Sequence, residues 1–327
     1  MALKRIELQL WVYTGITTDA PSSPTYTMSK TIVTSQTRIN FEISELVKDY
    51  IIHKFDNDYT SDCVWVKVFV EKFDDEDVSY SYDNYTTIFY EALSGWGAYE
   101  DGASPELSTD ALVSTSNMYV PENTASKIPI WAAGVGKFII GGVTTQVTDN
   151  GNTNQKIQYI PVPANSTSVA IYGTDDTTLK KTITIKNICE PKFTPYKVTF
   201  VNKYGAYEDF WFYKKTTETF DITDEFYKAN IIENSSASYN TYTTQNQRFN
   251  VNAETSITMN TGFILENMTS SIEQMFLSEN VWIRWSNKTL PIIPKTKSMQ
   301  KKTVLNNKLI DFTIDFKFAF NKINDIR

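Results

Sequence analysis

An alternating stretch near the end of the sequence constrains the fold more than any other feature. From Ile310 to Phe320 every even position is Ile or Phe, whereas the odd positions carry Asp, Thr, Lys or Ala. Successive side chains of a strand point to opposite faces, so this spacing predicts a long strand with one dry face. A helix would scatter the same aromatic side chains around its axis. The sequence therefore predicts a sheet in the last third of the chain.

A second stretch, Pro195 to Lys214, has the pattern of a β-hairpin. Tyr196, Val198 and Phe200 alternate with polar residues, and a run of four aromatic residues begins at Phe210. The polar segment between these runs contains Gly205, which favours a hairpin with a longer connection. The pentapeptide Gly-Ala-Tyr-Glu-Asp in this segment, 205–209, also occurs at 97–101. That recurrence suggests two related β units in one chain.

Composition extends this prediction to the whole chain. Aromatic residues make up 14% of the 327 residues, and charged residues only 21%. Aromatic and β-branched side chains suit a pleated, half-buried surface. We therefore expect a mainly β protein with two or three sandwich-like or barrel-like domains and a few short helices. The expected domains are an N-terminal β domain over 1–120, a middle β region over 121–190 that is either separate from or continuous with the first, and a C-terminal β-rich domain over 191–327.

Individual elements follow from periodicity and turn residues. In the first domain we expect strands at 6–13, 31–41, 64–73 and 80–90, and a short helix after Ser44 that this residue caps. In the middle region, short apolar runs between turn residues predict strands at 128–131, 137–140, 155–162, 168–172 and 182–188. In the last third, Met268, Ile272 and Met275 recur at helical spacing, which predicts a helix near 267–277. A strand at 281–285 is expected to follow it.

No catalytic, cofactor-binding or metal-binding residues stand out in the sequence. His53, the sole histidine, is the only base for a Ser-His-Asp or Cys-His mechanism, but its place after the short helix favours contact with the helix dipole. Gly134, Gly136 and the pair 141–142 lack the strand and helix that surround a dinucleotide-binding loop, so we interpret them as turn residues. Cys63 lies in an apolar run and is expected to be a buried free thiol. We therefore predict a protein that is not an enzyme and has no cofactor.

The charge pattern limits the possible partners. The net charge of −7 argues against a protein whose main task is to bind a phosphate backbone. Between Lys288 and Lys308 there are six lysines and no acid, whereas 71–77 holds five acids. Opposite patches of this kind suit a head-to-tail contact between identical subunits, although two solvated surfaces that never meet explain them equally well.

The sequence shows no signal peptide and no membrane span. The first 15 residues alternate apolar and charged side chains, and no run approaches the roughly 20 apolar residues that cross a bilayer. We therefore expect a protein made in the cytoplasm of its producing cell, with no membrane partner.

Three stretches in the last third carry a family resemblance: YKVTFVNKYGAYEDFWF at 196–212, NTGF at 260–263, and KLIDFTIDFKFAF at 308–320. They resemble the virion structural proteins of tailed bacteriophages that infect Bacteroidetes, including the crAss-like phages. The resemblance covers roughly 130 residues and concerns structural motifs, so no functional residues carry over. It implies a non-enzymatic component of the virion neck or tail, in which copies form a homo-oligomeric ring with other neck or tail proteins. Such a ring could surround the genome without reading its sequence.

Two other function classes remain open on the sequence alone. One is a receptor-binding or glycan-binding module at the tail tip, in which exposed aromatic side chains would stack on sugars. The other is a hydrolase of host polysaccharide, which requires a pair of carboxylates that lie close in space. Nothing among the 38 acidic residues singles out such a pair.

Overall fold

The computed structural model describes residues 3–33, 36, 38–74, 78–79, 85–103, 105, 107, 111–190, 192–231, 239–296, 298 and 309–323. The described chain is mainly β, which confirms the fold class expected from the sequence. It divides into two compact units. Unit 1 comprises Met1–Cys189, Thr199–Phe210 and Ser270–Asn280, and unit 2 comprises Glu190–Val198, Trp211–Thr269 and Val281–Arg327. The expected N-terminal and middle regions thus lie in unit 1 up to Cys189, whereas the C-terminal range contributes to both units.

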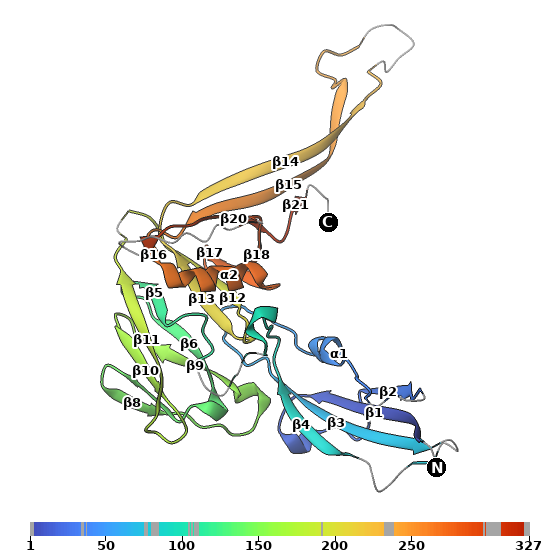
Figure 1. Ribbon diagram of the computed structural model, residues 1–327. Helices are drawn as coiled ribbons and strands as arrows, with labels where there is room; N and C mark the ends of the chain where they lie inside the picture. The colour runs from blue at the N-terminus through green and yellow to red at the C-terminus, as the bar shows by residue number, and fades with distance from the viewer. Residues whose placement is uncertain are drawn as a thin grey trace. The chain divides into compact units, whose positions relative to one another are not determined.

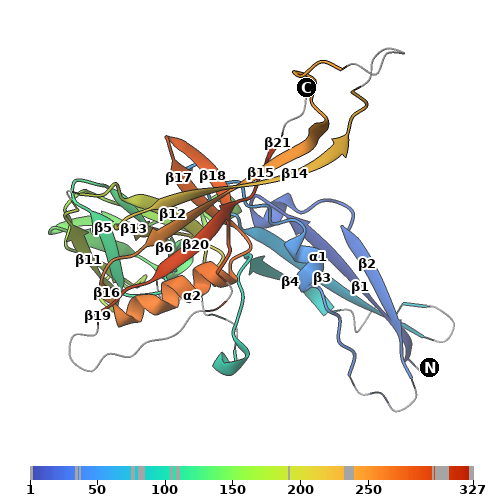
Figure 2. The ribbon, with the colours of Figure 1, turned by 90° about the horizontal axis from the view of Figure 1, so that it is seen from above.

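The first sheet of unit 1 is antiparallel, with the strand order β2-β1-β3-β4. Its strands are β1 (Leu3–Tyr13), β2 (Tyr26–Thr31), β3 (Val64–Asp74) and β4 (Tyr85–Ala92). Helix α1 (Ser44–Lys48) lies on one face of this sheet (Figure 2). On that face Leu10 and Val66 share a core with Val47 of α1 and with Ile51, which follows the helix. Each large apolar side chain buried in this way stabilises the fold by about 1.5–3 kcal/mol.

The second part of unit 1 is a sandwich (Figure 1). One layer is a five-stranded sheet of order β5-β11-β10-β7-β8. Its strands are β5 (Asn117–Pro121), β7 (Lys137–Ile140), β8 (Val143–Gln146), β10 (Ser168–Tyr172) and β11 (Leu179–Ile188). The other layer is the antiparallel pair β6 (Ser126–Trp131) and β9 (Ile157–Val162). Ile130 and Ile160 from this pair share one core with Val169 and Ile183 of the sheet. The five short strands expected in this region are thereby confirmed.

The glycine pair 141–142 forms the tight turn between β7 and β8. Gly141 has a φ of 56° and Gly142 a φ of 83°. Positive φ at both central residues is the requirement of a two-residue hairpin turn, and glycine meets it without steric cost. The interpretation of these glycines as turn residues is confirmed.

The expected hairpin near residue 200 consists of β12 (Tyr196–Val201) and β13 (Tyr207–Phe212), each of which has residues in both units. The expected helix is α2 (Thr269–Leu277), preceded by one 3₁₀ turn, Glu266–Met268. Met268, Ile272 and Met275 are buried, as their spacing predicted.

The hairpin β12-β13 continues into a larger sheet of order β13-β12-β17-β18-β20-β15-β14. The strands of this sheet other than β12 and β13 form the framework of unit 2. These strands are β14 (Thr217–Lys228), β15 (Asn246–Asn260), β17 (Val281–Trp285), β18 (Lys288–Pro294) and β20 (Thr313–Phe318), and β21 (Lys322–Ile323) also pairs with β15. A separate short ladder joins β16 (Ile264–Leu265) to β19 (Leu309–Ile310). The core contains Phe316, whose ring centroid lies 5.8 Å from that of Phe212.

The alternating stretch near the end of the chain has the expected dry face but is not one strand. Ile310, Phe312, Ile314, Phe316 and Phe318 are all buried, whereas Phe320 is exposed. The strand is interrupted at Asp311–Phe312 because the backbone of Phe312 pairs with Thr261 instead. The Phe312 N–H donates to Thr261 Oγ1 at 3.0 Å, and the Thr261 N–H donates to the Phe312 carbonyl at 2.9 Å.

Two expectations for the first domain are wrong. The second strand is β2, Tyr26–Thr31, rather than 31–41, because Tyr26 and Met28 pack against the apolar face of the first sheet. Ser44 does not cap α1: it is the first helical residue, the N-cap is Ile43, and the Ser44 hydroxyl donates to Glu42 instead.

The two copies of the pentapeptide do not form related β units. At 205–209 it forms the end of a connection and the start of β13, and Tyr207 is 2% exposed. At 97–101 it forms a 3₁₀ turn, Tyr99–Asp101, and Tyr99 is fully exposed. The environment of each copy therefore decides its structure.

Candidate functional site

A cluster of hydrogen-bonded polar side chains surrounds the connection between β12 and β13 in unit 1. Asn202 holds the backbone of this connection in place. Asn202 Oδ1 accepts hydrogen bonds from the backbone N–H groups of Tyr204 and Ala206, at 3.0 and 3.2 Å. Gly205 has a φ of 77°, and an added Cβ would lie 3.0 Å from both Leu93 Cβ and the Ser94 nitrogen. The close approach and the positive φ together require glycine here.

Three consecutive side chains of this stretch, at 207–209, form hydrogen bonds to other segments of unit 1. The Tyr207 hydroxyl donates to Asp62 at 2.5 Å. Asp209 accepts from the Tyr59 hydroxyl at 2.5 Å and from Thr199 at 2.6 Å. Their neighbour Glu208 is only 5% exposed and accepts four hydrogen bonds. Its donors are the backbone N–H and the hydroxyl of Ser114, the Asn202 amide at 2.9 Å and the Ser271 hydroxyl at 3.1 Å.

Burial of the aromatic side chains in this cluster fixes their protonation. The pKa values of Tyr59 and Tyr207 are raised well above the usual value by burial and then by the neighbouring carboxylates Asp209 and Asp62. Burial likewise raises the pKa of Tyr159, whose hydroxyl accepts from the Tyr207 N–H at 2.9 Å. The hydroxyls of Tyr59 and Tyr207 therefore remain protonated donors to Asp209 and Asp62 even at alkaline pH.

His53 belongs to this cluster and does not interact with a helix dipole. Helix α1 ends at Lys48, and His53 Nδ1 instead lies 2.9 Å from Asp62. The His53 side chain is 3% exposed, and its Nε2 has no hydrogen-bond partner among the described residues. A His-Asp pair can act as a base only when Nε2 reaches a nucleophile or a substrate. Neither residue lines the cavities described below, so the geometry favours a structural role.

A buried ion cluster, which the sequence did not indicate, joins the two parts of unit 1. Lys156 Nζ lies 2.5 Å from Glu91 on β4 and 2.8 Å from Asp149. Burial lowers the pKa of the Lys156 ammonium, but its hydrogen bonds to Asp149 and Glu91 more than offset this, so the pKa lies above its usual value. Lys156 also lies over the ring of Trp65. No spacing in the sequence connects these residues, because they meet only after both sheets have folded.

Cys63 is the buried free thiol that the sequence predicted, with 2% exposure. Burial raises its pKa to about 12. Nucleophilic attack needs a thiolate, so this environment suppresses the reactivity of Cys63. Cys189 is exposed and forms no disulfide.

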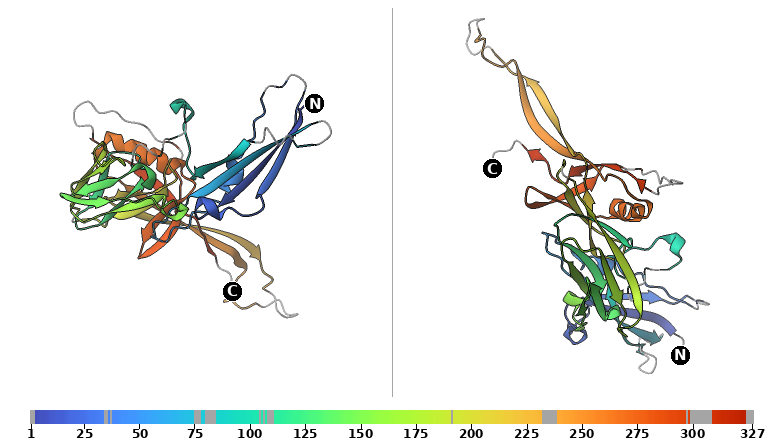
Figure 3. Two further views of the ribbon diagram at one scale, coloured as in Figure 1. Left: turned by 90° about the horizontal axis from the view of Figure 1, so that it is seen from below. Right: turned by 90° about the vertical axis from the view of Figure 1, so that its left-hand side faces the viewer.

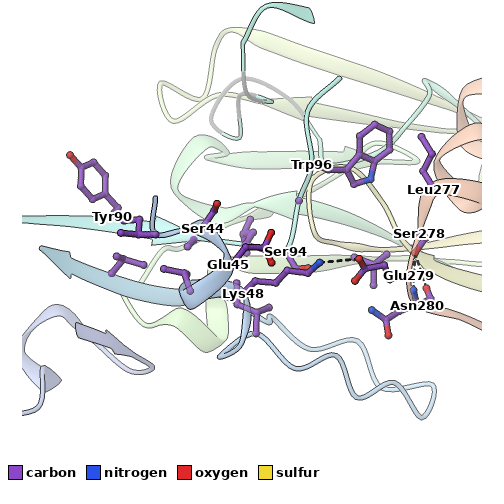
Figure 4. Close-up of a pocket in the computed structure, with 18 residues that line it drawn as sticks. Ser44, Glu45, Lys48, Tyr90, Ser94, Trp96, Leu277, Ser278, Glu279 and Asn280 are labelled. Atoms are coloured by element: carbon purple, nitrogen blue, oxygen red, sulfur yellow. Dashed lines mark hydrogen bonds and ion pairs between the residues drawn. The ribbon is translucent and has the colours of Figure 1, made fainter. Parts of the chain in front are cut away.

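A cavity of about 570 Å³ lies in unit 1 between α1, the end of β4 and the segment that follows α2 (Figure 4). Its apolar lining includes Val47, Ile51, Leu93 and Leu277, and the indole of Trp96 also contributes. Trp96 Nε1 has no hydrogen-bond partner among the residues that the structure describes. Figure 4 shows the ion pair between Lys48 and Glu279, 2.9 Å apart, as a dashed line. The cavity thus combines an apolar surface with a charged pair, while the Trp96 N–H is buried.

The hairpin of β14 and β15 in unit 2 exposes many large apolar side chains. We call these strands and the described residues between them the arm (Figures 1 and 3). Residues 256–260 of β15 pair with β20 and residues 252–253 with β21, whereas 246–249 pair only with β14 among the described residues. Seven large side chains of the arm are 42–84% exposed: Phe220, Ile222, Phe226, Tyr227, Tyr239, Tyr242 and Phe249.

The two charged patches expected from the sequence are only partly within the described residues. Lys288 begins β18, and Lys295 lies 3.5 Å from Ser256, but the other four lysines of that patch fall outside the description. Of the acidic group, Asp74 is buried and accepts from the Val78 N–H at 2.8 Å, while 75–77 lie outside the described residues. A contact between these two patches therefore stays a prediction.

Comparisons with known proteins identify no relative: no protein-family model, curated protein or solved structure matches the chain. Within the described ranges, no three His, Cys, Asp or Glu side chains gather closely enough to hold a metal ion. None of the helices described here is long and apolar enough to cross a bilayer.

Proposed function

We propose that this chain is a non-enzymatic structural subunit that assembles with copies of itself into a ring and docks other proteins in the neck or tail of a tailed bacteriophage. The arm carries this proposal. An isolated two-stranded hairpin is at best marginally stable in water, and an unpaired edge strand readily accepts another chain. A hairpin that exposes seven large apolar side chains is therefore best explained by a partner that covers it.

The size of the exposed surface supports an assembly contact. The exposed fractions of the seven side chains add up to about four complete side chains. At about 200 Å² for each aromatic side chain, this is roughly 800 Å². One partner in a standard interface contributes about 800 Å², so the side chains on the two faces of the arm together offer an area of that order.

The assignment to a phage neck or tail rests on the sequence resemblance of the last third. In that setting, contacts between different surfaces of identical subunits close into a ring when the rotation permits. The arm lies within the range that carries the resemblance. A structural subunit needs stable interfaces and no catalytic pocket. The side chains of His53 and Glu208 are buried and hydrogen-bonded within the protein, which suits such a role.

Mass measurement and electron microscopy of the purified chain test this proposal. We expect concentration-dependent multimers, and closed rings either alone or with neck and tail proteins from the same virion. A chain that stays monomeric at all accessible concentrations, and also in the presence of those proteins, would contradict the proposal.

The second candidate function is glycan or receptor binding, and the cavity beside Trp96 favours it. The Trp96 indole lines this cavity together with Ser44, Ser278 and Asn280, so the lining offers both a stacking surface and polar partners for a sugar. Titration of bacterial surface polysaccharide fragments, followed by tryptophan fluorescence, tests this function. We expect saturable binding that Trp96→Leu abolishes if the cavity is a glycan site, and no signal change for either protein if it is not.

A further inference from the structure

The outer edge of β8 is an open strand edge. β8 is the last strand of the five-stranded order, and all four of its residues are exposed. The Val147 N–H donates to the Gly136 carbonyl at 2.8 Å, so this pair is hydrogen-bonded. Hydrogen-bonded and non-bonded pairs alternate along an antiparallel ladder. With the register of β7 and β8, the backbone groups of Thr144 and Gln146 therefore point away from β7 toward the open edge.

An apolar cavity of about 420 Å³ lies beside this edge, between the two layers of the sandwich. Its lining includes Ile130, Phe138, Ile140, Val143, Ile160 and Pro161. Val143 is 67% exposed, so the cavity reaches solvent next to β8. An added strand at this edge would place alternate side chains over the cavity, because strand side chains alternate between the two faces.

The sheet that ends in β8 is positively charged. Its five strands contain Lys137, Lys180, Lys181 and Lys186, and no Asp or Glu. Two acids, Asp175 and Asp176, occur in the turn between β10 and β11, where Asp175 binds Thr177 and Thr178 within the turn. Asp176 lies 3.4 Å from the Gln146 amide. The strands themselves thus carry only cations; Lys137 of β7 pairs directly with Gln146 of β8, whereas the three lysines of β11 are separated from β8 by β10 and β7.

β14 of the arm has the complementary charge and an open edge of its own. It contains Glu218, Asp221, Asp224 and Glu225 against one cation, Lys228, and Arg248 of β15 pairs with Asp224. β14 is the last strand of its sheet. The Ala229 N–H donates to the Gln245 carbonyl at 2.8 Å, so by the same alternation the backbone groups of Phe226 and Lys228 point to the open edge. The Phe226 side chain is 63% exposed.

We propose that the arm of one copy docks on the sandwich of a second copy, where β14 pairs with the outer edge of β8 and Phe226 covers the apolar cavity. This contact rests on the proposed function and names the surfaces that would join the subunits. Charge selects β8 over the other open edge with exposed apolar side chains, β4. The sheet that contains β4 carries both signs, with Glu7, Glu71, Asp74 and Glu91 among its lysines and arginine. The strands of the β8 sheet carry lysines alone, and Asp176, the acid beside β8, is bound by the Gln146 amide. The contact joins different surfaces of identical chains, so it can propagate into a ring.

The test uses three variants of the full chain, studied by analytical ultracentrifugation and native mass spectrometry. Thr144→Pro removes a backbone N–H that points outward and leaves the pairing with β7 intact, which an edge strand tolerates. Thr144→Val is the matched control, because it keeps that N–H. Ile222→Thr with Phe226→Thr removes apolar area from the arm but retains residues that favour a strand.

We expect the wild-type chain and Thr144→Val to associate alike, while Thr144→Pro and the arm variant each associate at least about tenfold more weakly. An equal mixture of these two defective variants should form a heterodimer, because one supplies an intact arm and the other an intact β8. The wild-type association should also weaken with added salt, since opposite charges contribute to it.

Association of Thr144→Pro at wild-type strength would overturn the inference and leave the proposed function standing, since the arm would then dock at β4 or elsewhere. The absence of a heterodimer in the mixture would overturn it as well. A wild-type chain that never associates would instead refute the proposed function itself. If Thr144→Pro unfolds at a lower temperature than Thr144→Val, the variant Lys137→Glu is used in its place, because this change leaves the β8 backbone unaltered. Association of Lys137→Glu at the strength of the wild-type chain would again overturn the inference.

Discussion

Replacement of Glu208 by alanine is the sharpest test of the polar cluster that holds unit 1 together. The carboxylate of Glu208 is almost fully buried and accepts hydrogen bonds from three segments far apart in the sequence, through Ser114, Asn202 and Ser271. No cation pairs with it among the described residues. Glu208→Ala therefore removes a shared acceptor and leaves its donors buried.

The magnitude follows from the donors that lose their partner. Asn202 is fully buried, and a buried donor without an acceptor costs about 1–3 kcal/mol. A hydrogen bond to a charged group contributes about 1.5–3 kcal/mol, and Ser114 and Ser271 lose such bonds. We expect Glu208→Ala to lower the free energy of unfolding of unit 1 by about 4 kcal/mol. For a unit of this size, the midpoint of thermal unfolding should fall by about 8–16 °C.

The second copy of the pentapeptide provides a matched control. Glu100 occupies the same position in Gly-Ala-Tyr-Glu-Asp but lies on an exposed 3₁₀ turn. Glu100→Ala should change the free energy of unfolding by less than about 0.5 kcal/mol. Urea unfolding of both variants, followed by circular dichroism and tryptophan fluorescence, measures the difference. If the two substitutions destabilise the chain to within 1 kcal/mol of each other, on the order of the spread of surface effects, the role assigned to Glu208 is refuted.

Three further predictions follow from the buried groups of unit 1. Burial raises the pKa values of Tyr59, Tyr159 and Tyr207 above that of a tyrosine in the unfolded chain, which is about 10. The stability that these groups contribute should therefore be fully present below about pH 10 and decrease at higher pH, where the unfolded chain releases those protons. An absorbance titration should then show a tyrosinate fraction that appears only with unfolding, and ionisation of all 19 tyrosines in the folded chain would contradict this. A thiol reagent at neutral pH should modify Cys189 at once and Cys63 only after denaturant is added, and rapid modification of both would show that Cys63 is accessible. Lys156→Met should destabilise the chain by about 3 kcal/mol, because it leaves two carboxylates without their cation, and a loss below about 1 kcal/mol in urea unfolding would show that the ion cluster contributes little.

Periodicity predicted the parts of the fold in which a single residue pattern decides the structure. The dry face from Ile310 to Phe318 and the five short strands of the middle region follow directly from alternating apolar residues and turn residues. The buried side of α2 follows from its helical spacing. In these elements, local pattern and tertiary burial agree.

The errors occurred where tertiary contacts override the local pattern. Residues 31–41 alternate well enough for a strand, but β1 selects Tyr26–Thr31 as its partner because Tyr26 and Met28 complete the apolar face. The break at Phe312 depends on Thr261, which lies 51 positions away in the sequence. Glu208 was marked in the sequence only by the repeat of its pentapeptide, and the different fates of the two copies show that the sequence of five residues does not determine their environment.

The candidate assembly surfaces were the least predictable from sequence. The strand pattern of β14 does not reveal that its apolar side chains stay exposed, because exposure depends on which strands lie next to it. The acids of β14 and the lysines of the β8 sheet are distributed over strands and form no charge run. The sequence drew attention instead to the lysines of 288–308, most of which lie outside the described residues.

Hydrogen–deuterium exchange of β14 as a function of protein concentration tests the central claim, that the arm is covered by another copy of the chain. We expect amides in 217–228 to become protected as the concentration rises, whereas those of the exposed edge strand β2 should exchange equally fast throughout. If β14 exchanges at the same rate at every concentration while the measured mass increases, the arm does not form the contact between subunits.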